Sequence, residues 1–311
     1  MPGLLLGAAI GLAVYILIYF NFIKGPKCKS ERSLKGKTVV ITGANTGIGK
    51  MTALDLAQRG ARVILACRNK ERAETAVYDI RKESGNREVL FMKLDLASLA
   101  SIRAFAALFM DSEPRLDILI NNAGVCEGDK TVDGYNLIFG VNHLGHFLLT
   151  QLLLERLKHC APSRIVIVAS SAYCNGRINF ENLNSLPGGW IQDYCNSKLA
   201  NVLHARELAS KLEGTNVTCY AVHPGFVNTE LFRNLSPWRK LLLYCIAGLF
   251  FRNCTDGAQT LIHCAVQEGI ELYSGRYFSD CRAQEVRPHA RDDGVAKKLW
   301  EVSEHLVDLA G

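Results

Sequence analysis

The sequence lacks the patterns that commonly bind metal ions or nucleic acids. Its 11 cysteines include no Cys-x-x-Cys pair, and its 8 histidines include no His-Glu-x-x-His sequence. These spacings supply the common zinc sites, so we expect no metal, and we expect His143 and His146 to pack or hydrogen-bond. Lys and Arg number 36 against 30 Asp and Glu, but they are spread along the chain rather than gathered into basic runs. Nucleic acid is therefore not an expected partner.

A disulfide framework and disorder are excluded as well. The cysteine count is odd, and several cysteines lie within apolar runs, among them Cys67 and Cys219. This usage is typical of free thiols in a reducing compartment. Hydrophobic residues make up 49% of the chain and charged residues 21%. Such a composition indicates a folded protein with a sizeable core, and it excludes a collagen-like or coiled-coil chain.

An apolar segment opens the chain. Residues 3–23 form a run of 21 residues without a charge. A helix of that length spans about 30 Å, the thickness of the hydrocarbon core of a bilayer. No basic region precedes the run and no small-x-small cleavage site follows it, which favours a retained anchor over the alternative, a cleaved signal peptide. Six basic residues follow between positions 24 and 37, and the positive-inside rule places them in the cytosol.

These features divide the chain into three expected parts. We predict an N-terminal transmembrane anchor at residues 1–24, a basic linker at residues 25–36 and one catalytic domain at residues 37–311. The domain is expected to face the cytosol from the membrane of the endoplasmic reticulum.

Beyond the linker, short β-branched runs alternate with amphipathic helical stretches. Buried strands are predicted at residues 37–42, 61–67, 88–94, 116–121, 164–170 and 216–222. Helices are predicted at residues 48–59, 70–83, 98–110, 135–159 and 194–213. This alternation is typical of a parallel sheet with helices on both faces. We therefore predict an α/β fold with a single doubly wound parallel sheet of the Rossmann type.

A glycine-rich turn directly follows the first predicted strand. Residues 42–49 read TGANTGIG and lead into a predicted helix. Glycines permit a tight turn and a close approach of the backbone to a diphosphate, and the free N–H groups at a helix N-terminus attract an anion. We therefore predict a dinucleotide-binding loop made of Gly43, Asn45, Thr46, Gly47, Ile48 and Gly49.

The residues after the second predicted strand indicate which dinucleotide binds. A site that prefers NAD(H) usually carries an acidic residue there for the ribose 2′-hydroxyl. Here Arg68 occupies the region, and the first acid is Glu71. Because a guanidinium binds phosphate well, we predict NADP(H) as the cofactor. The alternative is that Arg68 is an exposed loop residue without this role.

Tyr194 and Lys198 are the first candidates for catalysis. They are four residues apart at the start of a predicted helix, so their side chains share one helical face. A free tyrosine has a pKa of about 10, and a nearby ammonium group lowers that pKa by stabilising the phenolate. The pair predicts acid–base catalysis, although this spacing alone is common on helix surfaces.

Several motifs together resemble the short-chain dehydrogenase/reductase family. They stand in the family's order, and they are the TGANTGIG loop, Asp95-Leu96, Asn121-Asn122-Ala123-Gly124, Asn142, Ser170-Ser171, Tyr194-x-x-x-Lys198 and Pro224-Gly225. The resemblance covers residues 36–280. Within the family, the segments ACRNKER, VNHLGHFLLT and YCNSKLANVL are similar to the membrane-anchored retinol dehydrogenase group.

The resemblance implies a role for each matching residue. Tyr194 is the implied acid–base residue, and Lys198 binds the nicotinamide ribose. Asn142 holds a water molecule in a proton relay, and Ser171 polarises the substrate oxygen. Ser171 lies 23 positions before Tyr194, more than is usual in the family, which leaves Ser170 as the alternative. Further cofactor contacts are implied for Asp95, Leu96, Asn122, Ala123, Gly124, Pro224, Gly225, Val227 and Thr229.

The implied activity is hydride transfer between NADP(H) and an apolar carbonyl compound. Residues 238–251 are rich in large apolar side chains, which favours either a buried helix or a lid that touches the membrane beside an apolar pocket. We expect reversible reduction of apolar aldehydes such as retinal or lipid aldehydes. The alternatives are a reductase of steroid or other lipid ketones, and a cofactor-binding membrane scaffold without catalysis. Self-association into a homo-oligomer stays open.

Overall fold

The computed structural model describes residues 19, 23–181, 183, 189–227 and 251–309. The predicted membrane anchor lies outside these residues apart from Tyr19, Ile23 and Lys24. The apolar stretch at residues 238–251 also lies outside them, except for Phe251, as does the predicted cofactor residue Thr229.

Eight strands of the described chain form one sheet in the order β3-β2-β1-β4-β5-β6-β7-β8. The strands β1 to β7 are parallel, and β8 is antiparallel to β7. The order reverses between β1 and β4, the place where doubly wound folds bind ligands. The predicted Rossmann-type sheet is thus confirmed. The strands are β1 (Thr38–Thr42), β2 (Arg62–Cys67), β3 (Val89–Lys93), β4 (Ile118–Asn121), β5 (Ser163–Val168), β6 (Val217–His223), β7 (Tyr277–Ser279) and β8 (Arg282–Gln284).

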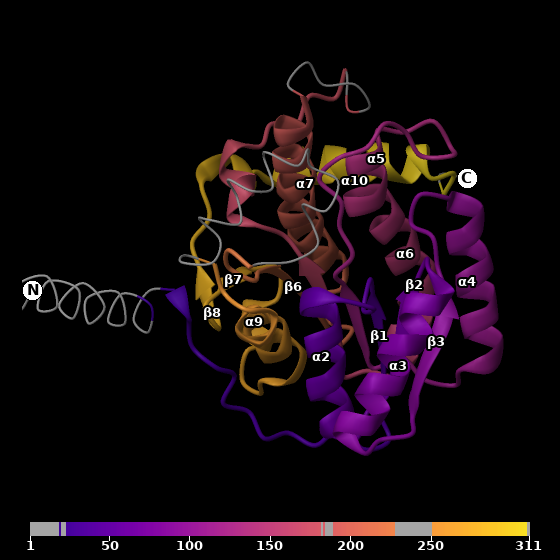
Figure 1. Ribbon diagram of the computed structural model, residues 1–311. Helices are drawn as coiled ribbons and strands as arrows, with labels where there is room; N and C mark the ends of the chain where they lie inside the picture. Colours follow the sequence, from indigo (N-terminus) through magenta and orange to yellow (C-terminus); the bar gives the residue numbers. More distant parts are fainter. Residues whose placement is uncertain (1–18, 20–22, 182, 184–188, 228–250, 310–311) are drawn as a thin grey trace, which may run out of the picture.

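Helices connect the strands and cover both faces of the sheet (Figure 1). The α-helices are α2 (Gly47–Gln58), α3 (Lys70–Ser84), α4 (Leu99–Ser112), α5 (Leu137–Phe139), α6 (Gly145–His159), α7 (Gly189–Lys211), α9 (Cys254–Val266) and α10 (Asp293–Leu306). A π-helical turn, η2 (Gly140–Leu144), joins α5 to α6. Short 3₁₀ turns are η3 (Ser171–Asn175), η5 (Glu271–Tyr273) and η6 (Pro288–Ala290).

Polar side chains fix where several helices begin. Asn69 accepts a hydrogen bond from the third backbone N–H of α3, and Ser98 does the same for α4. Asn253 and Asp292 cap α9 and α10 in the same way. Each cap satisfies a backbone donor that has no partner within the helix.

Alternation along the strands builds one hydrophobic core on each face of the sheet. In β1, Val40 packs on one side, whereas Val39 and Ile41 pack on the other, as successive strand residues must. The first core lies under α4, α6, α7 and α10, with Phe105 and Phe147 among its largest side chains. The second lies under α2, α3 and α9. Helices therefore cover both faces of the sheet, and the loops that follow the parallel strands lie at its carboxyl edge.

The six strands predicted from the sequence are all present, with ends within two residues of those predicted. The helix α7 begins at Gly189, five residues before the predicted start, so Tyr194 lies inside it rather than at its first turn. The strands β7 and β8 were missed, because three residues each are too few to show alternation. Asp280 and Cys281, both with φ of 53°, form the two-residue turn between them, as tight hairpins require.

The predicted linker at residues 25–36 packs against the domain instead of standing apart from it. Leu34 is buried in the second core, and its N–H donates to the carbonyl of Arg59 at 2.9 Å. The N–H of Cys28 donates to Oε1 of Gln259 in α9 at 3.0 Å. In Figure 1 this indigo stretch passes below α9 on its way to β1. Ordered structure therefore begins before residue 37.

One helical stretch of the described chain, Leu137–His159, is long and apolar enough to cross a membrane. Its most apolar window is 78% buried inside the domain, which makes it a core helix.

Candidate active site

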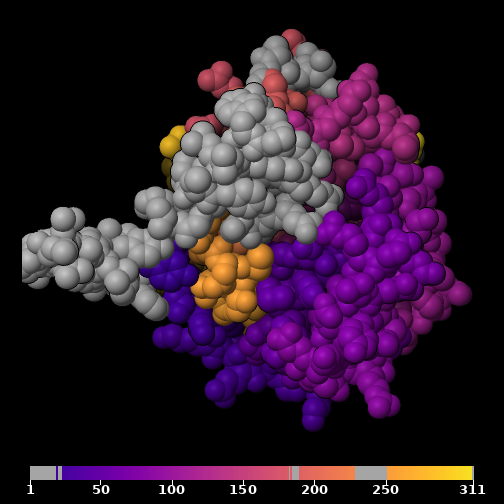
Figure 2. All heavy atoms as spheres, in the orientation of Figure 1, coloured from indigo at the N-terminus to yellow at the C-terminus, as the bar shows by residue number. Residues whose placement is uncertain are grey.

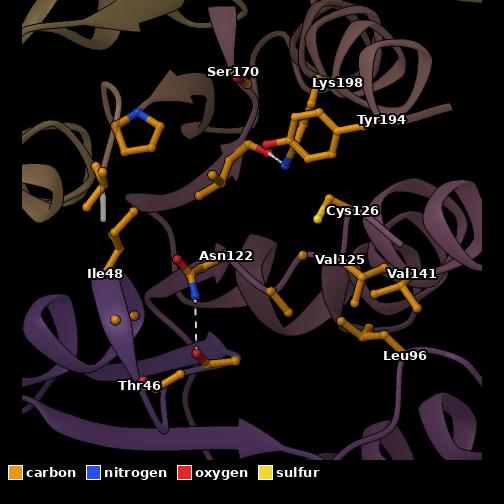
Figure 3. Close-up of a pocket in the computed structure, with 18 of the residues that line it drawn as sticks. Thr46, Ile48, Leu96, Asn122, Val125, Cys126, Val141, Ser170, Tyr194 and Lys198 are labelled. Atoms are coloured by element: carbon orange, nitrogen blue, oxygen red, sulfur yellow. Dashed lines mark hydrogen bonds between the residues drawn. The ribbon is translucent and has the colours of Figure 1, made fainter. Parts of the chain in front are cut away.

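One large cavity lies at the carboxyl edge of the parallel sheet. Its volume is about 850 Å³. Parallel strands bring their carboxyl ends to one edge, so residues that are far apart in the sequence meet there. The cavity is lined by Gly43 after β1, Arg68 after β2, Asp95 after β3, Asn122 after β4, Ser170 after β5 and Pro224 after β6. Asn122 and Ser170 are labelled in Figure 3.

The glycine-rich turn packs closely against the end of β4. A Cβ atom on Gly43, whose φ is 64°, would lie 2.9 Å from Cα of Ala123. On Gly49 it would lie 2.5 Å from Nδ2 of Asn122. Any larger residue would push the turn away from the sheet. Glycine thus allows the turn to pack closely against the sheet. Thr46 and the first residues of α2 then line the cavity.

Buried hydrogen bonds hold this turn in place. The hydroxyl of Thr42 accepts from the N–H groups of Asn122 and Ala123, both at 2.9 Å. Nδ2 of Asn122 donates to the carbonyl of Thr42 at 2.8 Å. Nε2 of His146 lies 2.8 Å from the same hydroxyl, and burial lowers the pKa of His146 to about 3. The expectation that His146 is a hydrogen-bonding residue is confirmed.

Two arginines line the part of the cavity that follows β2. Arg68 was expected there, and Arg72, one turn into α3, was not. Both side chains are exposed. Asn69 stands between them as the cap of α3 and accepts from the N–H of Arg72 at 2.8 Å. This end of the cavity therefore carries two guanidinium groups, which favour a phosphate.

Tyr194 and Lys198 lie together at the other end of the cavity (Figure 3). Nζ of Lys198 donates to the carbonyl of Val168, the last residue of β5, at 3.0 Å. It lies 5.4 Å from the centroid of the Tyr194 ring. Nδ2 of Asn201 donates to the same carbonyl at 3.1 Å. These bonds fix α7 relative to the strand end.

Burial dominates the ionisation of this pair. It lowers the pKa of Lys198 from 10.5 to about 8. Burial also raises the pKa of Tyr194 above 10, against a smaller lowering by the hydroxyl of Ser170. The net shift is thus opposite to the expected lowering by the lysine, because desolvation of the phenolate raises the pKa of Tyr194. At pH 7 Tyr194 is a phenol and Lys198 is mainly an ammonium group.

The serine hydroxyl that acts on Tyr194 belongs to Ser170 rather than Ser171. β5 ends at Val168, and Ser170 caps the η3 turn, with its hydroxyl accepting from the N–H of Ala172 at 3.2 Å. Ser171 is already the first residue of that turn, although it also lines the cavity. This favours Ser170, the alternative, over Ser171, and the choice between the two serines stays a prediction.

Asn142 does not reach the cavity wall. It is fully buried in the π-helical turn η2. Its side chain accepts from the N–H of Val125 at 2.8 Å and donates to Oγ of Ser197 at 3.0 Å. Its carbonyl accepts from Nδ2 of Asn201 at 3.0 Å. Asn142 therefore ties the segment after β4 to α7 beside Lys198, and its expected role in a water relay stays a prediction.

The other predicted cofactor residues in the described chain all line the cavity. They are Asn45, Thr46, Gly47, Ile48, Leu96, Ala123, Gly124, Gly225 and Val227, together with those named above.

Sequence reasoning missed Cys126 and Glu127, which also line the cavity, as do Phe226 and Phe251. They lie in loops whose course only the fold defines. Arg72 could have been predicted from the sequence, because it lies four residues after Arg68, close to the spacing of one helical turn.

The sequence is matched over residues 37–240 by the short chain dehydrogenase family. The match covers more than half of the chain, and the sheet order and site agree with it. The chain belongs to the short-chain dehydrogenase family of oxidoreductases, and within it to the retinol-dehydrogenase-like group.

Among its relatives is human "Dehydrogenase/reductase SDR family member 13", which is 58% identical over 313 residues, 99% of this chain and 83% of the relative. Human "Retinol dehydrogenase 12" is 52% identical over 93% of this chain and 92% of its own length. A crystal structure of an uncharacterised protein from Mycobacterium paratuberculosis is 36% identical, with a TM-score of 0.73, over 91% of this chain and 98% of that one.

The buried ammonium group of Lys198 destabilises the folded chain, which gives a prediction. Lys198→Met is expected to raise the free energy of unfolding at pH 7 by on the order of 1–3 kcal/mol, because it removes a desolvated charge at the cost of one hydrogen bond. The folded pKa of about 8 lies below the ordinary value of 10.5. The unfolded wild type therefore binds more protons between these values, so wild-type stability rises with pH there and the advantage of the variant shrinks.

Chemical denaturation of both proteins from pH 6 to pH 11 measures this difference. A variant that is less stable than wild type at pH 7 would contradict the prediction.

Proposed function

We propose that this chain is a membrane-anchored, NADPH-dependent oxidoreductase that interconverts apolar aldehydes and alcohols and favours reduction. One observation carries the proposal: Tyr194, Lys198 and Ser170 stand at one end of a cavity whose other parts are a glycine-rich turn and an arginine pair. A dinucleotide is long enough to extend from the phosphate-binding end of this cavity to the end where Tyr194 can donate a proton.

The residues of the cavity fit NADPH. The flat turn that Gly43 and Gly49 permit would hold the diphosphate at the start of α2. Arg68 and Arg72 would bind the 2′-phosphate, and Asp95 would lie near the adenine end. When bound, the nicotinamide supplies the hydride that reduces the carbonyl carbon.

The protein must supply one proton and stabilise one developing charge. Tyr194, held as a phenol by burial, donates its proton to the carbonyl oxygen as the hydride reaches the carbon, giving the alcohol. The ammonium group of Lys198 stabilises the phenolate that remains. The hydroxyl of Ser170 accepts from Ala172, so its proton is available for a hydrogen bond to the substrate oxygen. The phenol is the protonation state that reduction requires at the start of the step, and cytosolic NADPH would favour that direction.

Apolar side chains around Tyr194 support an apolar substrate. Val125, Leu137 and Val141 line the cavity, and Phe226 and Phe251 lie 6.2 Å apart between ring centroids at its rim. Retinal is the first candidate, because relatives of this chain are named retinol dehydrogenases. Membrane anchoring rests on the uncharged run at residues 3–23, and such a run would hold the domain at the endoplasmic reticulum membrane, where apolar aldehydes dissolve.

The proposed activity predicts NADPH consumption by membranes that contain this protein. We expect turnover with all-trans-retinal or medium-chain aldehydes above that with steroid ketones, and a loss of about 100-fold or more in Tyr194→Phe, because the proton donor is removed. The measurement is NADPH oxidation over this substrate panel with the variant as control. If NADPH binds but no compound is turned over faster than in the variant, the chain is a cofactor-binding scaffold instead.

The arginine pair predicts the choice of dinucleotide. Arg68→Glu is expected to lower the ratio of kcat/KM for NADPH to that for NADH by about tenfold or more, since it replaces a charge-assisted hydrogen bond with repulsion. Arg87, an exposed arginine outside the cavity wall, provides the matched control as Arg87→Glu. An unchanged ratio in Arg68→Glu would show that the arginine does not meet a phosphate.

The two serines predict different losses of activity. Ser170→Ala is expected to lower kcat by about 100-fold, because it removes a hydrogen bond to the developing charge on the substrate oxygen. Ser171→Ala should retain activity within about tenfold. Steady-state kinetics at saturating NADPH compare them, and the reverse order would return the role to Ser171.

A further inference from the structure

A buried arginine joins residues 23–25 to the wall of the cavity. Arg252 is 7% exposed and lies outside the cavity wall. Its Nε donates to the carbonyl of Ile23 at 2.5 Å, and its Nη2 forms an ion pair with Asp280 at 2.7 Å. Its backbone N–H donates to the carbonyl of Phe226 at 2.7 Å. Arg252 thus links three segments that are distant in the sequence, two through its side chain and one through its backbone N–H.

Two glycines enclose the guanidinium group. A Cβ atom on Gly25, whose φ is 71°, would lie 2.7 Å from Cζ of Arg252. On Gly225, whose φ is 88°, it would lie 2.6 Å from Nη1. The arginine is therefore packed between the backbone that follows the apolar run and the backbone that follows β6. Figure 2 shows the indigo residues before β1 beside orange α9 on one face of the molecule.

The segment that Arg252 supports forms part of the cavity wall. Pro224, Gly225, Phe226 and Val227 all line the cavity. Val227 also forms a parallel bridge with Arg252. A shift of the guanidinium group would therefore move the wall on the side of the cavity next to β6.

We propose that Arg252 is a positioning residue that couples the seating of residues 23–25 to the dinucleotide site, so that the segment leaving the predicted membrane anchor helps to set the affinity for NADPH. The inference rests on the proposed function for its ligand. Its geometric part, the joint between residues 23–25 and 224–227, is independent of any ligand.

The test uses Gly25→Ala in the full chain, because this change affects Arg252 from outside the cavity. Gly36→Ala is the matched control: Gly36 has a similar φ of 74°, but nothing lies within 4 Å of a Cβ atom there. Both variants carry the same backbone strain, and only the first displaces the guanidinium group. We expect Gly25→Ala to raise the Kd and KM for NADPH about threefold or more over Gly36→Ala, with kcat at saturating NADPH retained.

Arg252→Ala is expected to raise the Kd for NADPH as well, and Gly25→Ala should add nothing in that background, since both act through one contact. Arg164→Ala serves as its control, because Arg164 is equally buried and pairs with exposed Glu271 but lies at the opposite, amino end of β5. Equal affinities in Gly25→Ala and Gly36→Ala, or additive effects in the double variant, would overturn the inference.

Hydrogen exchange separates this inference from the proposed function. Without added dinucleotide, peptides that cover residues 224–227 and 251–253 should exchange faster in Gly25→Ala than in Gly36→Ala. If they do and the wild type binds no NADPH, the joint exists and the proposed function fails. If exchange is unchanged while NADPH binds to the wild type and is oxidised with an aldehyde, the joint fails and the proposed function stands.

Discussion

The parallel alignment of β1 to β6 is the constraint on which the whole site depends. Because every one of these strands ends at the same edge of the sheet, the glycine-rich turn, the arginine pair and the serine after β5 converge on one cavity. The carbonyl of Val168, the last residue of β5, is one example. It accepts hydrogen bonds from both Lys198 and Asn201 of α7. The strand end thereby fixes the position of α7.

Burial gives this site its chemical character. In water, tyrosine and lysine would have similar pKa values, close to 10. In the cavity, desolvation moves them apart, raising the pKa of Tyr194 and lowering that of Lys198. In the proposed reduction, the phenol is protonated at the start, and the neighbouring cation would stabilise the phenolate that forms when the proton leaves. The same desolvation lowers the free energy of unfolding of the chain, because the charge of Lys198 is buried. Such a loss of stability is typical of residues that serve a function.

Most of the fold and much of the site could be predicted from the sequence. The hydrophobic periodicity and the turn residues that bound each run predict the strands. A glycine-rich turn between a strand and a helix predicts the part of the cavity that binds phosphate. Three things were beyond reach. Burial of Tyr194 reverses the pKa shift that its lysine neighbour suggests. The turn at Ser170 favours the hydroxyl that the sequence leaves as the alternative. Arg252 contacts Ile23, which is more than 200 residues away in the sequence. Each depends on packing between distant segments, which no local pattern encodes.

Hydride transfer to an apolar carbonyl is the central claim, and isotope transfer tests it most directly. The full-length protein in membranes would be given NADPH that carries deuterium at one of the two C4 positions of the nicotinamide, together with retinal or a medium-chain aldehyde. We predict that one of the two labelled forms delivers a single deuterium to the former carbonyl carbon of the alcohol, and that Tyr194→Phe forms little of it. Alcohol without deuterium from both forms, or no alcohol at all, would contradict the account.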